Sequence, residues 1–183
     1  SKSFGSNLVI KDFSLDIEEG QTLVLMGPSG CGKTTLAHLI LGMLKPDKGS
    51  IEGISGKSIA AVFQEDRLLE HLTAIKNIQI LFKKETAEAE ILKHFTELGL
   101  DIDSARKPAS KLSGGQKRRV AILRAMIANK DFICLDEPFK GMDKDTKLNT
   151  MKYVKKHITN KSALLITHDE QEAQFFGEDR IIY

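Results

Sequence analysis

The segment Thr22-Leu23-Val24-Leu25-Met26-Gly27-Pro28-Ser29-Gly30-Cys31-Gly32-Lys33-Thr34 joins a short apolar run to a glycine-rich turn. Residues 22–26 are suited to a buried parallel strand. After the turn, apolar residues recur at helical spacing up to Pro46, namely Leu36, Leu39, Ile40, Met43 and Leu44. We therefore predict a strand, a tight loop and a helix that continues to about Leu44.

The loop, residues 27–34, matches the whole pattern G-x-x-x-x-G-K-[ST]. Its glycines let backbone N–H groups point inward at a phosphate, and the positive end of the following helix adds attraction. Lys33 is expected to reach the β- and γ-phosphates, and Thr34 to bind Mg²⁺. In this context we set aside the plainer alternative, a glycine turn with an exposed lysine.

A second apolar run, residues 132–135, ends in Asp136, Glu137 and Pro138. Proline does not continue a central strand, so the strand is expected to stop there. Ligands of open parallel sheets bind beyond the carboxyl ends of the strands, which places both acids near the bound phosphates. We predict that Asp136 holds Mg²⁺ through its water shell and that Glu137 orients or deprotonates the attacking water. The alternative is a solvated acidic turn.

The string Leu112-Ser113-Gly114-Gly115-Gln116 predicts a helix start, because Ser113 and Gln116 have the spacing of a capping box. Two glycines are poor helix formers, but they suit a place where a phosphate approaches the backbone. The helix is expected to turn Val120, Leu123, Met126 and Ile127 inward. For the cations at residues 117–119, a solvated face and contacts with a nucleotide or partner both stay open.

Together these motifs resemble the nucleotide-binding domain of the ABC ATPase family, over nearly the whole chain. The resemblance implies that Phe4 stacks on adenine, that Gln64 touches Mg²⁺ and senses the γ-phosphate, and that His168 contacts the γ-phosphate. It implies that Asp143 is the D-loop aspartate, although Lys140 and Gly141 depart from the usual pattern. The implied catalytic residues are Glu137, His168 and Lys33, and the implied Mg²⁺ ligands are Thr34, Gln64 and Asp136. The other residues expected to bind ATP are Gly27, Pro28, Ser29, Gly30, Cys31, Gly32, Thr35, Ser113, Gly114, Gly115, Gln116 and Asp143.

The predicted fold is an α/β P-loop NTPase sheet, mostly parallel, with an inserted α-helical subdomain and a small N-terminal β part. About 100 positions separate Lys33 from Asp136, more than one crossover requires. We predict a single ABC ATPase domain over 1–183, with a core of about 1–64 and 112–183 and a helical subdomain of about 65–111. Its amphipathic helices are expected to bury Ile75, Ile78, Phe82, Ile91, Leu92, Phe95 and Leu98, with the charged stretch 83–90 between them.

The resemblance implies an ATPase subunit that powers a membrane ABC transporter. Two subunits, either two copies or a copy and a homologue, would pair about a twofold axis, with each ATP between one phosphate loop and the partner's residues 113–116. The region from Gln64 to Leu72 resembles importers of nitrate, sulfonates or taurine. There Leu68, Leu69 and Leu72 form either a groove for a permease helix or part of the subdomain's own core. An extracytoplasmic binding protein is a further expected partner.

Two other functions stay open at this stage. One is a soluble ABC ATPase of the DNA repair or translation type, although long coiled-coil insertions are missing. The other is a nucleotide-binding module that has lost turnover, which intact Lys33, Asp136, Glu137 and His168 argue against.

The composition is typical of a single folded domain in a reducing compartment. The chain has 183 residues, 41% of them hydrophobic and 28% charged, and only two cysteines, Cys31 and Cys134. A net charge of +2 gives no reason to expect nucleic acid as a partner. Apolar runs are too short to span a bilayer, and no signal peptide is visible. We expect a cytoplasmic protein, peripheral on the cytoplasmic face of the cell membrane.

Overall fold

The computed structural model describes residues 1–81, 88–177 and 180–182. Phe82, assigned above to a helix, lies outside the described residues, as does most of the charged stretch 83–90. The chain forms two compact units. The first contains Ser1–Ala61, Lys130–Glu137 and Asn160–Tyr183, and the second contains Val62–Asn129 and Pro138–Thr159. The predicted boundaries of the helical subdomain, 65–111, stay a prediction.

A five-stranded sheet with the order β4-β5-β6-β3-β7 forms the centre of the first unit. Its pairings β3 with β6, β5 with β6 and β3 with β7 are all parallel, so the predicted α/β fold with a mostly parallel sheet is confirmed. The elements of this sheet and its helices are β3 (Thr22–Met26), α1 (Lys33–Ile40), β4 (Ile59–Val62), β5 (Phe132–Asp136), β6 (Ser162–Ile166), α7 (Glu170–Phe176) and β7 (Arg180–Ile182).

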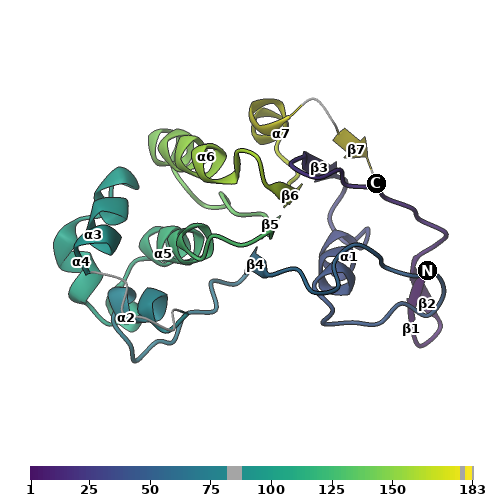
Figure 1. The fold of residues 1–183 in the computed structure, drawn as a ribbon, viewed down its shortest axis with the longest axis horizontal. Coiled ribbons are helices and arrows are strands. Elements are labelled where there is room, and N and C mark those ends of the chain that lie inside the picture. Colours follow the sequence, from purple (N-terminus) through teal and green to yellow (C-terminus); the bar gives the residue numbers. More distant parts are fainter. Residues whose placement is uncertain (82–87, 178–179, 183) are drawn as a thin grey trace. The chain divides into compact units, whose positions relative to one another are not determined.

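Helices cover both faces of the sheet (Figure 1). Alternate residues of a strand point to opposite faces, so Leu23 and Leu25 of β3 pack with Leu36 and Leu39 of α1 in one core. Between them, Val24 turns to the other face, where α7 lies against β3. Both faces are covered, and the central strands β3, β5 and β6 are accordingly apolar except at one end of each, as is typical of a parallel sheet.

The helix after the phosphate loop is shorter than its apolar pattern predicts. It ends at Ile40, with Leu41 as its last cap residue, and the prediction that it continues to Leu44 is wrong. The reason is Gly42, whose φ of 69° is left-handed and stops a right-handed helix four residues before Pro46. Met43 is consequently exposed rather than part of a buried helix face.

The small N-terminal β part is a two-stranded antiparallel hairpin, β1 (Lys2–Phe4) and β2 (Asn7–Ile10). Phe4 pairs with Asn7 across the turn, and its ring is about half exposed, at 49% of its free surface. The Lys2 ammonium lies 5.7 Å from the centre of that ring. The structure thus leaves an aromatic face at the surface where the resemblance predicted a base-stacking residue.

The second unit is helical. Its elements are α2 (Ala74–Gln79), α3 (Glu88–Glu97), α4 (Ile102–Arg106), a 3-10 turn η1 (Ala109–Lys111), α5 (Gly114–Ile127) and α6 (Lys144–Ile158). Figure 1 shows α2, α3 and α4 gathered around α5, with α6 beside α5. Most of the apolar residues predicted to face inward are buried, including Ile78, Ile91, Phe95 and Val120, whereas Ile127 and Leu92 are half-buried.

Asn77, on α2, is a fully buried polar side chain that fixes the preceding loop. Its carbonyl oxygen accepts a hydrogen bond from the Leu69 N–H at 2.7 Å. Its amide nitrogen donates to the carbonyls of Leu69, Leu72 and Thr73 at 3.0, 3.3 and 3.1 Å. Burial of an amide group is unfavourable unless the group is hydrogen-bonded. The bonds of Asn77 offset this cost, and they also fix the backbone of residues 69–73.

Replacing Asn77 by alanine removes these bonds and leaves buried backbone groups without partners. We expect Asn77→Ala to lower the free energy of unfolding by about 2 to 4 kcal/mol. Urea unfolding followed by circular dichroism measures the loss. Lys76→Ala, at the exposed neighbouring position, is the control and should change the stability by less than about 0.5 kcal/mol. Equal stabilities of the two variants would contradict the assigned role of Asn77.

Candidate functional site

The phosphate loop requires glycine at position 32 for two reasons. Gly32 is the N-cap of α1 and has a φ of 107°, which disfavours any residue with a Cβ atom. A Cβ there would also stand 3.0 Å from the Val9 side chain and 3.3 Å from its carbonyl oxygen. The loop therefore passes so close to β2 that only glycine fits, and α1 begins directly after it.

The side chain of Lys33 folds back against the loop that precedes this residue in the sequence. Its ammonium donates hydrogen bonds to the carbonyls of Gly27 and Pro28, both at 2.7 Å, and only 7% of the residue is exposed. The cation is thereby held against the curve of residues 27–31, where the pattern predicts a bound phosphate.

Thr34 and Asp136 meet although they are 102 positions apart. The Thr34 hydroxyl, in the first turn of α1, donates to Oδ2 of Asp136 at 2.8 Å. Asp136 ends β5 and is only 3% exposed. Two of the three predicted Mg²⁺ ligands are therefore in contact, and both offer the oxygen atoms that Mg²⁺ prefers.

Glu137 has a strained backbone at the end of β5. Its φ of 47° is in the left-handed region, which a residue with a side chain rarely adopts. The parallel ladder holds it there, because its N–H donates to the Ile166 carbonyl at 2.9 Å. Strain of this kind clusters at functional sites. The carboxylate that this backbone carries is largely buried, with 11% of the side chain exposed.

His168, just after β6, contacts the same carboxylate. Its Nδ1 lies 3.2 Å from Oε1 of Glu137, and the imidazole is 58% exposed. With a proton on Nδ1, the ring donates to Glu137 and keeps Nε2 for another partner. The structure thus brings the predicted residues Lys33, Thr34, Asp136, Glu137 and His168 together in the first unit.

The predicted capping box at the start of α5 is confirmed. The Ser113 oxygen accepts from the Gln116 N–H at 3.2 Å, and the Gln116 side chain accepts from the Ser113 N–H at 2.9 Å. The Gln116 amide also donates to the Ser104 hydroxyl at 2.9 Å, so that side chain is held within the unit. At Gly114 and Gly115, no described atom other than those of the neighbouring residues and of the helix's own backbone lies within 4 Å of where a Cβ would stand. The space over these glycines is open to an approaching group.

Arg118 is a positioning residue that sequence reasoning missed. The solvated basic face considered above is wrong for this residue, whereas a contact with a nucleotide or partner stays a prediction. The residue is 5% exposed and donates to the carbonyls of Phe63, Gln64 and Pro138 and to Asp66. It thus ties the segment that follows β4 to the residue that follows Glu137. Its neighbours behave differently: Lys117 pairs with Glu70, and Arg119 donates to the carbonyls of Leu98, Gly99 and Gly115.

Two other predicted residues lie in the second unit. Gln64 is exposed directly after β4, and its carbonyl accepts from Arg118 at 3.2 Å. Asp143 is the N-cap of α6 and accepts from the Thr146 N–H at 3.0 Å. Hydrogen bonds from the backbone and side chain of Thr146 hold the pKa of Asp143 below its ordinary value, so this exposed carboxylate is ionised at neutral pH.

The two cysteines have contrasting environments. Cys134 lies within β5 and is 1% exposed, and its burial, followed by the charge of Asp136, raises the pKa of the thiol to about 12. Cys31 lies half-buried in the phosphate loop, 3.7 Å from the Lys33 ammonium. Only the second thiol lies in the loop that the sequence pattern predicts to bind a phosphate.

Comparison with known proteins gives consistent matches. The family described as "ABC transporter" matches residues 10–140. The ergothioneine transport ATP-binding protein EgtV of Helicobacter pylori is 37% identical, over 95% of this chain and 89% of its own. The aliphatic sulfonates import ATP-binding protein SsuB 1 of Agrobacterium fabrum is 36% identical, over 100% and 67% of the two chains. The taurine import ATP-binding protein TauB of Pseudomonas aeruginosa is 33% identical, over 95% and 71%. For other import ATP-binding proteins, the chain spans 52% to 60% of their length.

Solved structures agree with the sequence relatives. The dimeric structure of MJ0796, a bacterial ABC transporter cassette, is 31% identical and superposes with a TM-score of 0.83, over 95% of this chain and 85% of that one. The same cassette in a post-hydrolysis state with ADP and Pi gives a TM-score of 0.80 at 28% identity, over 94% and 88%. Among the described residues, no helix has both the length and the apolar character needed to cross a membrane.

The two cysteines provide a test of the phosphate loop. We expect a maleimide to modify Cys31 in the native protein and to leave Cys134 unmodified until the protein is unfolded, because Cys134 is buried and stays a neutral thiol. ATP should slow the reaction at Cys31. Mass spectrometry of digested protein measures the rate of modification at each cysteine. The variant Cys31→Ser should lose the faster of the two reactions. Native labelling of Cys134 at the same rate, or a rate at Cys31 that ATP does not change, would contradict the assignment.

Proposed function

Because this chain belongs to the ABC transporter family and is an ATP-binding, ATP-hydrolysing subunit, we propose that it powers a membrane importer through the residues gathered around its phosphate loop. The observation that carries the proposal is the meeting of Thr34 with Asp136 and of Glu137 with His168 in the first unit. Family membership and import relatives favour this function over a soluble ATPase of DNA repair or translation. They also argue against a module without turnover.

In this proposal each side chain has a separate task. Lys33 exchanges its two carbonyl partners for the β- and γ-phosphates, where its positive charge stabilises the transferring group. The Glu137 carboxylate accepts a proton from the attacking water, while His168, which contacts that carboxylate, donates a hydrogen bond from one ring nitrogen to the γ-phosphate. The half-exposed ring of Phe4 stacks on adenine.

We further propose that Mg²⁺ is bound with the nucleotide, by Thr34, by Asp136 and by Gln64. The touching oxygens of Thr34 and Asp136 support this assignment. When bound, Mg²⁺ neutralises charge on the β- and γ-phosphates. Asp136 is suited to the task because its carboxyl group is buried and held at the end of a central strand.

A second ATPase subunit completes the site in this proposal. The open space over Gly114 and Gly115 would admit the γ-phosphate of ATP bound to the phosphate loop of the partner, with the Ser113 hydroxyl and the N–H groups of α5 as donors. The dimeric MJ0796 cassette supports such pairing. Hydrolysis then removes the contacts of the γ-phosphate and lets the pair open. Asp143, ionised at the start of α6, is proposed to contact the partner.

Substituting the proposed base tests this mechanism. We expect Glu137→Gln to bind ATP with an affinity close to that of the parent protein, to lose at least about 100-fold in turnover and to accumulate as an ATP-bound dimer, because glutamine has the same size but does not accept the proton. Phosphate release and light scattering with ATP measure turnover and mass. The control is Glu19→Gln, at an exposed position of the same unit. Turnover of Glu137→Gln at the control rate would refute the assignment.

We propose that the permease docks on residues 64–72. Its membrane-spanning subunit would place this protein on the cytoplasmic face of the membrane, and an extracytoplasmic binding protein would deliver the substrate. The three leucines are not part of the unit's buried core, since Leu69 is 42% exposed and Leu68 and Leu72 are half-buried. Asn77 fixes this loop, and Arg124 donates to the carbonyls of Asp66 and Arg67 at 3.1 and 2.9 Å. The apolar surface formed by Leu68, Leu69 and Leu72, held in place by these bonds and next to Arg67, suits a short amphipathic helix.

A negative charge introduced into this leucine surface should disrupt docking without unfolding the protein. We expect Leu69→Glu to lose the multi-span membrane protein that co-purifies with tagged protein from detergent-solubilised membranes of its source cell. Leu148→Glu, which alters a leucine of similar exposure (43%) on α6, should retain it. Quantitative mass spectrometry compares the two samples. Equal recovery of the membrane protein with both variants would remove residues 64–72 from the interface.

A further inference from the structure

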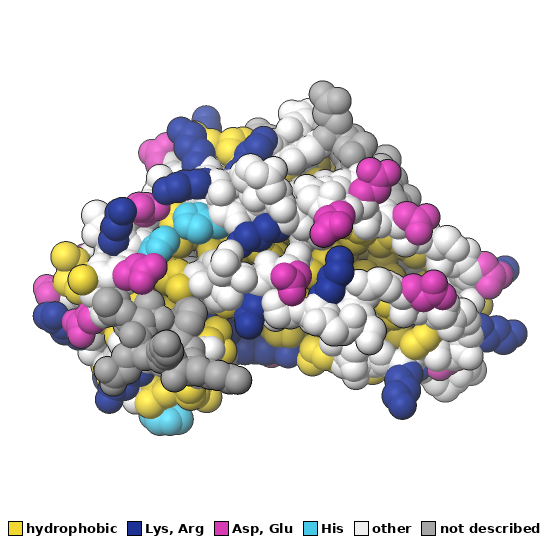
Figure 2. Space-filling view, in the orientation of Figure 1, with side chains coloured by type: hydrophobic (Ala, Val, Ile, Leu, Met, Phe, Trp, Pro, Cys, Tyr) yellow, Lys and Arg dark blue, Asp and Glu magenta, His cyan; other side chains and the backbone are white. Residues whose placement is uncertain are grey.

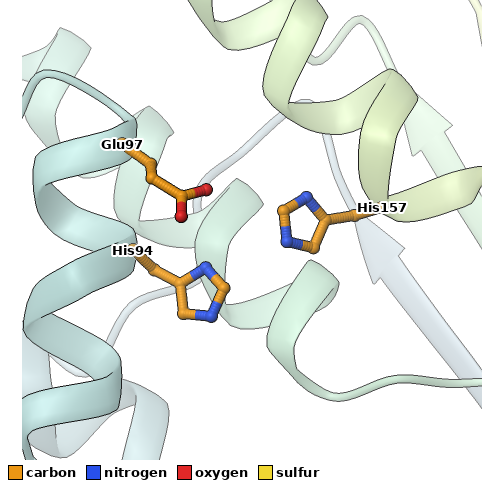
Figure 3. Close-up of side chains that lie close together, drawn as sticks. All are labelled: His94, Glu97 and His157. Carbon is orange, nitrogen blue, oxygen red and sulfur yellow. The ribbon is translucent and has the colours of Figure 1, made fainter.

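The second unit contains a group of metal-binding side chains outside the phosphate-loop region. His94 and Glu97 are three residues apart on α3, and therefore share a face of that helix. His157 lies in the last turn of α6. One ligand atom from each of the three lies within 4.8 Å of the other two. Figure 3 shows the carboxylate and the two imidazole rings directed into the space between α3 and α6.

Tyr153 orients both histidines. Nδ1 of His157 lies 2.7 Å from the Tyr153 carbonyl, to which only a protonated Nδ1 can bond, so Nε2 of His157 carries the free lone pair. The Tyr153 hydroxyl bonds Nδ1 of His94 at 2.9 Å. Imidazoles that bind metal ions are commonly held in this way, with one nitrogen bonded to a carbonyl or other polar group and the second directed at the metal.

For His94 and Glu97, the direction of the pKa shift favours the form that binds a metal ion. Burial, followed by the charge of His157, lowers the pKa of His94, which favours the neutral imidazole that binds metals. Burial alone would raise the pKa of Glu97, but the hydrogen bond and the charge of Lys156 hold it below its ordinary value. Glu97 is therefore a carboxylate at neutral pH.

We propose that His94, Glu97 and His157 bind a divalent transition-metal ion, Zn²⁺, which joins α3 to α6. Two histidines and one glutamate are a known set of protein ligands for Zn²⁺, with water in the fourth position. Tetrahedral ligands at about 2.0 to 2.2 Å from the metal are about 3.3 to 3.6 Å apart. Side-chain rotations that bring the three atoms about 1 Å closer complete the site.

The site is also accessible. All three residues are half-buried, and Figure 2 shows histidine side chains at the surface over the region of α3 and α6, beside acidic and basic side chains. Lys156 is the competing cation, because its ammonium lies 3.2 Å from Oε2 of Glu97 and is itself 67% exposed. An exposed lysine is easily displaced, since such ion pairs contribute little to stability.

A Zn²⁺ titration of the purified, nucleotide-free protein tests the proposal, after metal removal with a chelator and in competition with a chromophoric zinc indicator. We expect one site in the parent protein, and binding at least about tenfold weaker in His157→Ala and in Glu97→Gln. His71→Ala, an exposed histidine of the same unit, is the matched control and should bind as the parent does. Substituting Co²⁺ should give the visible spectrum of a site without thiolate ligands, which separates it from Cys31 and Cys134.

Two more variants separate metal binding from a structural role. Tyr153→Phe keeps the buried ring and removes the hydroxyl that orients His94, so it should weaken Zn²⁺ binding by about 10-fold. Lys156→Gln removes the competing cation and should tighten it. A parent protein that binds Zn²⁺ no better than a folded His94→Ala/His157→Ala double variant would overturn the proposal, and so would Glu97→Gln with unchanged affinity. Because no nucleotide takes part, these results are independent of the proposed transport function.

Discussion

Parallel pairing of β5 with β6 and of β6 with β3 is the constraint on which the site depends. The register sets Asp136 beside Ile166, and Ile166 beside Leu25. The residues that follow these three positions therefore leave the sheet at one edge, although they come from distant parts of the chain. At that edge Thr34 contacts Asp136, and Glu137 contacts His168. The same ladder holds Glu137 in its left-handed conformation, through its N–H bond to Ile166.

Much of this arrangement could be predicted from the sequence, because its signals are local. The phosphate-loop pattern, the apolar runs before Asp136 and His168, and the capping box at Ser113 each predict an element without knowledge of distant residues. Gly42 shows where a local pattern failed: apolar spacing suggested a helix to Leu44, whereas one left-handed glycine ended it at Ile40. The boundary of the helix was set by backbone conformation rather than by the apolar face.

Contacts made by residues far apart could not be predicted in the same way. Arg118 follows a glycine-rich helix start and resembles any cation of an exposed helix face, yet it is buried against carbonyls from residues 63, 64 and 138. His94 and Glu97 have helical spacing, which is a weak signal, and His157 is more than fifty positions away. Only the packing of α3 with α6 brings the three together. Asn77 likewise reads as an ordinary helix residue until its four bonds are seen.

The central claim is that ATP is held between the phosphate loop of one subunit and residues 113–116 of another. Mixing two inactive variants tests it most directly: Lys33→Ala, which lacks the phosphate-binding cation, and Ser113→Arg, which blocks the start of α5. A pair formed from one copy of each retains one site with both halves intact, so the mixture should recover ATPase activity that neither variant has alone. A mixture as inactive as its separate components, with both variants folded, would contradict the shared site.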